Sequence, residues 1–266
     1  MLSGCANKLF SETRRGGALI LPLWFLLAGV VTAFAGTSPS SPSPQSSGGP
    51  GSGSASAATL EATLAGMDQA AARFTSVTGD LDYTKVTVIV DDHSTDRGTI
   101  AFEKTRGRSP LDKAFRVMLA FREPAEKFVL FLGDKVSLYR PKIAAVEEYD
   151  MGGKQDLVEQ FLLLGFGTPG SELQKSYQIV WRGEDSLDGE RTLHLELTPK
   201  SEQAGARLKK IELWLSPETY QPVQQKFWEP SGDYMIARYT NLKLNISIPD
   251  RTFRLPLKGK VKFEKR

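Results

Sequence analysis

The sequence has 266 residues, of which 40% are hydrophobic and 24% charged, with a formal net charge of +3. Without the charged side chains of residues 1–35, 31 basic residues face 30 acidic ones, which is no electrostatic signature of a nucleic-acid-binding protein. No cysteine follows Cys5. This excludes a disulfide framework and a thiolate metal site from the rest of the chain.

The first 35 residues have the pattern of a targeting segment. Arg14 and Arg15 precede an apolar run that begins at Gly17 and ends in small residues at Ala35. A basic region, an apolar core and a small-x-small site predict a secretory signal peptide. The run is also long enough for an uncleaved membrane anchor. Either alternative places the folded part outside the cytoplasm, in the periplasm, free or anchored to the inner membrane.

Composition divides the remainder of the chain into a linker, one domain and a tail. Residues 36–58 are almost entirely Ser, Pro, Gly, Ala and Thr, without charge or aromatic side chains, which predicts a flexible linker. Residues 59–257 carry the apolar periodicity of a folded domain. Residues 258–266 form a basic tail, which we expect to be a solvated terminus or a contact with anionic lipid.

The domain begins with one helical pattern and continues with many strand patterns. Apolar residues from Leu60 to Phe74 recur every three or four positions, which predicts an amphipathic helix. Runs of period two, separated by Gly, Pro, Asp and Asn, predict strands. These runs lie at 81–90, 98–104, 114–122, 127–132, 135–140, 144–150, 177–182, 192–198, 210–215, 223–228 and 234–239.

Two stretches decide the expected architecture. The last three strands are joined by connections too short for a parallel return, so they form an antiparallel meander that the other strands extend. Residues 156–166 are too apolar for a solvated helix and too short to span a bilayer. They predict a helix packed on the sheet or a lid over an apolar site. The fold class is α+β and mostly antiparallel β.

Signatures of catalysis and metal binding are absent from the sequence. His93 and His194 stand in no metal-ligand spacing, and His194 is most simply a surface or cross-strand residue. The chain has no GxSxG elbow and no phosphate-binding glycine loop. We therefore predict neither an enzyme nor a cofactor or metal site.

Large apolar side chains are abundant on the predicted strands and in the 156–166 segment. Many belong to an ordinary core, but a curved sheet with two helices has more apolar surface than the helices cover, and the surplus would line a cavity for an apolar ligand. Periodicity permits both readings. The candidate cavity residues are Phe102, Phe115, Val117, Leu119, Phe121, Leu130, Leu157, Phe161, Leu164, Trp181, Leu213 and Phe227.

The order of several local motifs resembles the LolA/LolB-like superfamily of periplasmic lipoprotein carriers and receptors, of which the chain looks like a distant member. The motifs are Gly98 to Lys104, Phe115-Arg116-Val117 with Leu119 and Pro124, Gly133-Asp134-Lys135 with Leu138-Tyr139 and Pro141, Tyr149-Asp150, Gly189, Leu197 to Lys200, Ile211 to Trp214, and Asn241, Ile248 and Phe253 to Pro256.

The resemblance implies an incomplete, strongly curved antiparallel β-barrel whose concave face is covered by helices acting as a lid. In the best-known carriers an arginine on an early strand holds this lid. The matching place here is Lys104, with Arg106 close by. The late-strand Asp-Gly turn of the family is replaced by Glu229 to Asp233.

The leading functional hypothesis from these expectations is a non-enzymatic periplasmic carrier or receptor of lipoprotein acyl chains or lipids. Its partners would include an inner-membrane release complex and an outer-membrane acceptor, and no nucleic acid. The alternatives are a non-catalytic envelope sensor or interaction module on the same fold, and a structural domain tethered to the inner membrane.

Overall fold

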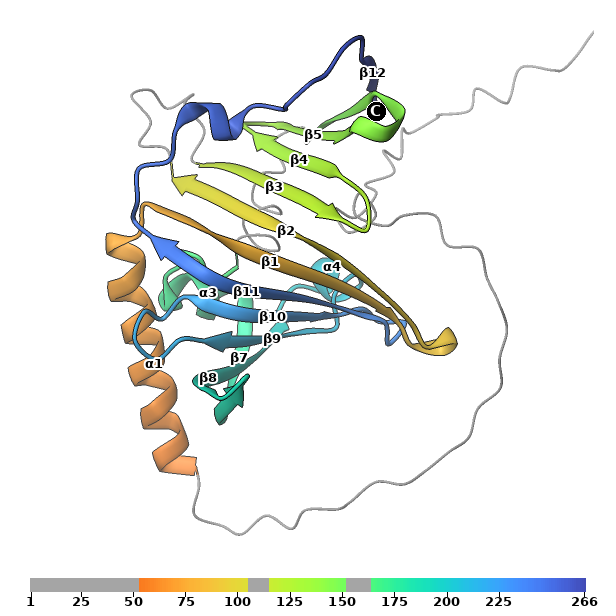
Figure 1. Cartoon of the computed structure of the whole chain (residues 1–266). Coiled ribbons are helices and arrows are strands. Elements are labelled where there is room, and N and C mark those ends of the chain that lie inside the picture. Colours follow the sequence, from red (N-terminus) through yellow and green to blue (C-terminus); the bar gives the residue numbers. More distant parts are fainter. Residues whose placement is uncertain (1–52, 105–114, 152–163) are drawn as a thin grey trace, which may run out of the picture. The chain divides into compact units, whose positions relative to one another are not determined.

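Among the residues that the structure describes, twelve strands form one sheet in the order β12-β6-β5-β4-β3-β2-β1-β11-β10-β9-β8-β7. The computed structural model describes residues 53–104, 115–151 and 164–266 (Figure 1). The elements are α1 (Gly53–Arg73), β1 (Ser76–Thr87), η2 (Val88–Val90), β2 (Asp92–Lys104), β3 (Phe115–Glu123), β4 (Lys127–Leu132), β5 (Lys135–Arg140), η3 (Pro141–Ile143), β6 (Ala145–Asp150), α3 (Gly170–Ser176), β7 (Tyr177–Leu187), β8 (Glu190–Pro199), α4 (Glu202–Gly205), β9 (Lys210–Leu215), β10 (Pro222–Trp228), β11 (Tyr234–Leu244), η4 (Asp250–Phe253) and β12 (Lys262–Lys265).

The sheet is antiparallel except at one edge and is not closed. Strands β9, β10 and β11 form the predicted meander, and β11 pairs with β1, so the N-terminal and C-terminal halves share one sheet. Strands β12 and β7 are the two ends of the strand order. The predicted α+β fold, an incomplete curved barrel with helices, is confirmed (Figure 1).

Most strand predictions agree closely with the structure. The predicted strands at 127–132, 135–140 and 210–215 coincide with β4, β5 and β9. The predicted helix is α1, which begins at Gly53, within the stretch predicted as linker. Helix α3 was not predicted at all.

Three predictions are wrong in part. Val88–Val90 were expected to end a strand but form a 3-10 turn at the tip of the β1–β2 hairpin. Leu164 and the next two residues, expected to end a helix, lie in a turn, and residues 152–163 are outside the described part. The tail expected to be solvated contains β12, which pairs in parallel with β6.

One face of the sheet, which we call the outer face, is covered by the chain after β11. Ile248 and Phe253 are buried against Ala101 of β2, Met118 of β3 and Leu130 of β4, and Leu255 packs beside them. The Arg116 guanidinium lies 4.2 Å from the centre of the Phe253 ring and bonds to Asp250 at 2.8 Å.

Candidate functional site

The opposite face of the sheet, which we call the inner face, is apolar across most of its strands. Strand register assigns the residues to faces, because directly opposed residues of an antiparallel pair share a face. Phe102 lies opposite Val117, and Ile100 lies opposite Leu119. These four side chains are at most 2% exposed. The inner face therefore begins as a continuous apolar surface on β2 and β3.

The same surface continues around the sheet in both directions. Further buried members lie on each neighbouring strand, and the register places them on the inner face. They are Val77 and Leu81 on β1, Val129 and Phe131 on β4, Val136 and Leu138 on β5, Met235 and Ala237 on β11, Phe227 on β10, Ile211 and Leu213 on β9, and Leu195 and Leu197 on β8.

Most candidate cavity residues from the sequence lie on this face. Phe102, Phe115, Val117, Leu119, Phe121, Leu213 and Phe227 are buried there. Trp181, on β7, lies opposite Leu195 of β8 and is partly buried. Leu164 is buried but belongs to a turn.

Leu130 was assigned to the wrong face. It lies opposite Met118 on the neighbouring strand, and both belong to the outer-face cluster under Ile248 and Phe253. Leu157, Phe161 and Arg106 are outside the described residues.

Helix α1 contributes an apolar stripe to the inner side. Leu64, Met67, Ala71 and Phe74 are buried, as their spacing in the sequence predicts. The Phe74 ring lies 5.3 Å from that of Phe102 and 6.5 Å from that of Phe166, centre to centre. The principal contacts of α1 with other described elements are to α3 and β7. Helix α1 thus packs mainly at the β7 side, and Phe74, the residue just after the helix, reaches Phe102.

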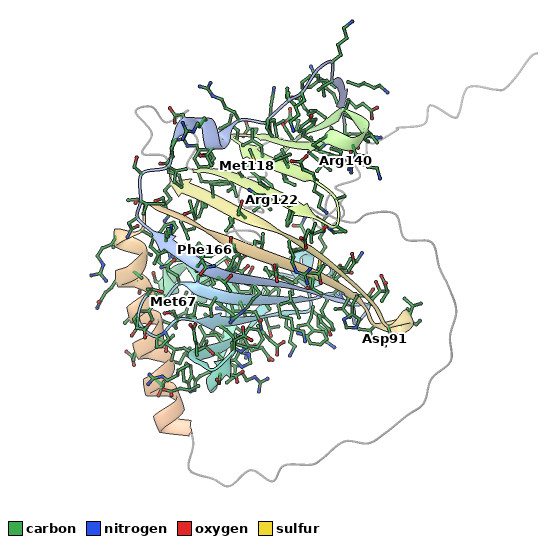
Figure 2. All side chains as sticks on the ribbon, viewed as in Figure 1. Met67, Asp91, Met118, Arg122, Arg140 and Phe166 are labelled. Atoms are coloured by element: carbon green, nitrogen blue, oxygen red, sulfur yellow. The ribbon has the colours of Figure 1, made fainter. Side chains whose placement is uncertain are left out.

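A short turn, residues 164–168, is fixed to the inner face by its backbone. We call it the Phe166 turn, after the residue labelled in Figure 2. The Phe166 ring packs edge-on against the Tyr239 ring, with 5.0 Å between the ring centres. The Gln225 amide donates to the Leu164 carbonyl oxygen. The Gly167 N–H donates to the Gln221 side-chain oxygen at 3.1 Å. Buried polar groups of this kind need such partners, so the two glutamines position the turn.

Sequence reasoning missed both glutamines. Gln225 is 1% exposed and stands two positions before Phe227, so it occupies an inward site where period two predicts an apolar residue. Its side-chain oxygen accepts a hydrogen bond of 2.8 Å from the Tyr239 hydroxyl. A polar residue that interrupts the inward side of a strand was the signal available in the sequence.

Lys104, predicted to hold a lid, contacts the Phe166 turn. Its Nζ donates to the Gly167 carbonyl oxygen at 2.6 Å and lies 5.7 Å from the centre of the Phe74 ring. Gly167 has φ +58°, and a Cβ there would lie 2.3 Å from the Phe74 ring. The lysine thus bridges the end of β2 to a turn that only glycine fits. A lid-holding role for Lys104 stays a prediction.

Lys104→Met should loosen the Phe166 turn without unfolding the sheet. The change keeps the aliphatic stem but removes the charged donor to the Gly167 carbonyl, so we expect a loss of roughly 1–2 kcal/mol in unfolding free energy. Hydrogen exchange at Gly165 and Gly167 should quicken by a larger factor than exchange in β4. Equal protection of both regions in the variant and the wild type would contradict this contact.

His194 lies on the outer face and takes part in a stacked cross-strand pair. Its ring stacks on Trp214 at 4.3 Å, and the Trp214 indole N–H donates to Asp185 at 2.9 Å. Burial is the main cause that lowers the pKa of His194. The prediction of a cross-strand residue is confirmed.

The described residues contain neither a metal-binding cluster nor a membrane-spanning helix. Across 53–104, 115–151 and 164–266, no three His, Cys, Asp or Glu side chains are grouped so that they could hold a metal ion. In the same ranges, no helix combines the length and the apolar character needed to cross a membrane.

Comparisons with known proteins give similarities in structure. No protein-family model matches the sequence, and no curated protein matches it. A MucA/MucB complex from Pseudomonas aeruginosa matches at 17% identity and a TM-score of 0.44, over 74% of this chain and 61% of that one. A LolA superfamily protein from Nitrosomonas europaea matches at 14% identity and a TM-score of 0.35, over 74% and 97%. LprF from Mycobacterium bovis matches at 14% identity and a TM-score of 0.42, over 72% and 96%.

The chain is similar to LolA superfamily proteins. It spans 59–66% of the length of the MucB chains that it matches.

Proposed function

We propose that the protein is a periplasmic carrier or receptor that binds the acyl chains of lipoproteins or lipids against its inner face. The observation that carries the proposal is an apolar surface that continues, among the described residues, from β5 through β4, β3, β2, β1, β11, β10 and β9 to β8. Barrels of about eight strands are just wide enough for side chains to fill, and larger ones enclose ligand space. The sheet here is not closed, and in this proposal the acyl chain packs against the buried apolar side chains of its inner face.

Burial of the acyl chain would supply the affinity. Each methylene removed from water contributes roughly 0.8 kcal/mol, and the aromatic rings of Phe102, Phe115 and Phe121 supply broad apolar area. Carriage through water requires that the chain be covered on its solvent side. In this proposal Phe166 and Phe74 belong to that cover, because both rings pack over the inner face.

The sequence of residues 1–35 supports location in the cell envelope. The proposed carrier would receive its ligand from an inner-membrane release complex and deliver it to an outer-membrane acceptor. Neither transfer requires catalysis, since exchange between two apolar sites breaks no covalent bond.

Adjacent residues on β3 give a matched test. Leu119 faces inward and Met118 faces outward, and they are 2% and 4% exposed. Asn at either position should lower the free energy of unfolding by a similar amount, because each substitution buries an amide group that has no hydrogen-bond partner. Only Leu119→Asn should weaken acyl binding, by tenfold or more. Displacement of a fluorescent fatty acid from the full chain measures this difference.

Two results would overturn the proposal. If folded Leu119→Asn binds the acyl probe as tightly as the wild type, the inner face is not part of the binding site. Failure of the wild type to bind any acyl probe would reject carriage and favour the second candidate.

The second candidate is a non-catalytic interaction module, and the β1–β2 hairpin tip favours it. Val88, Ile89 and Val90 are 52%, 90% and 61% exposed at that tip, beside Asp91, which Figure 2 labels there. Asp233 accepts a hydrogen bond from the Val88 N–H at 2.9 Å. Three exposed aliphatic residues beside carboxylates suit a partner protein with an apolar groove and a basic rim.

A further inference from the structure

The Tyr83 hydroxyl is a buried polar group on the inner face that makes no hydrogen bond with the described residues. Tyr83 lies on β1, opposite Asp96 of β2 and Ala237 of β11, and is 8% exposed. Among the described residues, its hydroxyl has no hydrogen-bond partner although the oxygen is buried. Buried hydroxyls almost always have a partner, and an orphan is costly. The missing partner is therefore expected to come from outside the protein.

The polar groups around Tyr83 already have partners of their own. Asp96 accepts a hydrogen bond of 2.6 Å from Lys127. The Tyr239 hydroxyl donates to the Gln225 side-chain oxygen at 2.8 Å. Tyr239 lies on the same face and is also buried, but the protein supplies a hydrogen-bond partner for its hydroxyl and none, among the described residues, for that of Tyr83. This difference makes Tyr239 the matched control.

The charged groups near Tyr83 restrict which chemical group of a ligand could bind to its hydroxyl. Burial raises the pKa of Tyr83 far above its usual value, and the nearby Tyr239, Asp96 and Glu229 add to the shift. The hydroxyl is therefore neutral at all physiological pH values and can donate a hydrogen bond. The carboxylates of Asp96 and Glu229 disfavour an anionic ligand group such as a free carboxylate or a phosphate. A neutral carbonyl oxygen fits the position.

We propose that the Tyr83 hydroxyl is a polar subsite of the inner face that donates a hydrogen bond to the ester or amide carbonyl of a bound acyl chain. The inference rests on the proposed function and adds selectivity to it. Apolar surface alone binds any hydrocarbon chain of suitable length, whereas a donor at a fixed place selects esterified or amidated chains and fixes their register. Lys127, paired with Asp96 and 5.1 Å from the centre of the Phe121 ring, keeps that carboxylate engaged elsewhere.

The test compares two probes that differ by one carbonyl. Binding of 1-palmitoylglycerol, an ester, and 1-hexadecylglycerol, the corresponding ether, is measured on the full chain, with N-palmitoylethanolamine as the amide. The wild type should prefer the ester over the ether by about threefold to tenfold, the range of one neutral hydrogen bond. Tyr83→Phe should bring this ratio close to one. Tyr239→Phe should lower stability and leave the ratio unchanged.

The outcomes separate the two proposals. If the wild type binds the ester and the ether with equal affinity, the Tyr83 subsite is overturned and acyl carriage stands. The same conclusion follows if Tyr83→Phe leaves the wild-type affinity ratio unchanged. A wild-type ratio of one overturns the subsite whether or not Tyr83→Phe folds, and this variant is expected to fold because it removes only a buried hydroxyl that has no partner among the described residues. No binding of any probe overturns acyl carriage and the subsite together. If Tyr83→Phe abolishes the preference over the ether for the ester but not for the amide, the subsite recognises glycerol esters. If it abolishes the preference for both probes, the subsite recognises acyl carbonyls in general.

Discussion

Gly98→Ala is expected to lower the free energy of unfolding by about 2–3 kcal/mol, the upper range for an overpacked core. A Cβ at Gly98 would lie 2.2 Å from the Ala120 carbonyl oxygen and 2.6 Å from the Phe121 Cα. Both atoms belong to the backbone of β3, which cannot rotate away as a side chain could. Strands β2 and β3 would have to separate where the register between them shifts.

The position of Phe121 links this change to the binding site. Phe121 lies opposite Gly98 and is fully buried on the inner face, so its displacement should also reduce acyl binding. Gly205→Ala is the control, because a Cβ there meets no atom within 4 Å. Gly205 ends α4, where alanine is at least as favourable as glycine. Urea denaturation of both variants measures the difference. Equal midpoints would contradict the close approach of β2 and β3 at Gly98.

The sequence predicted strands well where local pattern alone determines them. Strands β4 and β5 were found at their observed bounds, because alternating or continuous apolar residues end there at Gly133 and Pro141. Helix α1 was found from an apolar stripe maintained over four turns. In these cases the pattern that shapes the segment also records which residues are buried.

Prediction of faces was less successful, and Leu130 shows why. Val129, Leu130 and Phe131 are all buried, because β4 has the inner face on one side and the 248–255 segment on the other. A strand covered on both faces loses the polar-apolar alternation that would distinguish them. Nothing local to Leu130 shows that the end of the chain returns to cover it.

Elements with few buried residues were missed for a related reason. Helix α3 buries only Gly170 and Leu173 and is too short to show a helical period. Strand β12 consists mainly of exposed side chains, and its pairing with β6 depends on backbone hydrogen bonds to a distant segment. The turn at Val88–Val90 has strand composition, yet the chain reverses there because Asp91 takes φ +49° and donates its N–H to the Val88 carbonyl.

Gln225→Leu is expected to be among the most destabilising single substitutions on the inner face. Leucine has a similar volume but removes the donor to the Leu164 carbonyl and the acceptor for the Tyr239 hydroxyl. Each group left unsatisfied in a buried site costs roughly 1–3 kcal/mol, so the loss should reach roughly 2–5 kcal/mol. The gain in apolar character does not offset this loss, because the two abandoned partners stay in place.

The neighbouring Gln224 provides a control for the Gln225→Leu substitution. Gln224 is the next residue on β10 but lies on the outer face, opposite Trp214 and Arg238, and is only partly buried. Gln224→Leu should change stability by no more than about 0.5 kcal/mol. Denaturation and hydrogen exchange of both variants measure the contrast, with faster exchange at Gly165 and Gly167 expected only in Gln225→Leu. Equal effects of the two substitutions would mean that Gln225 does not position the Phe166 turn. A selective effect would show that an inward polar residue, placed against the strand pattern, fixes the turn that packs over the proposed acyl site.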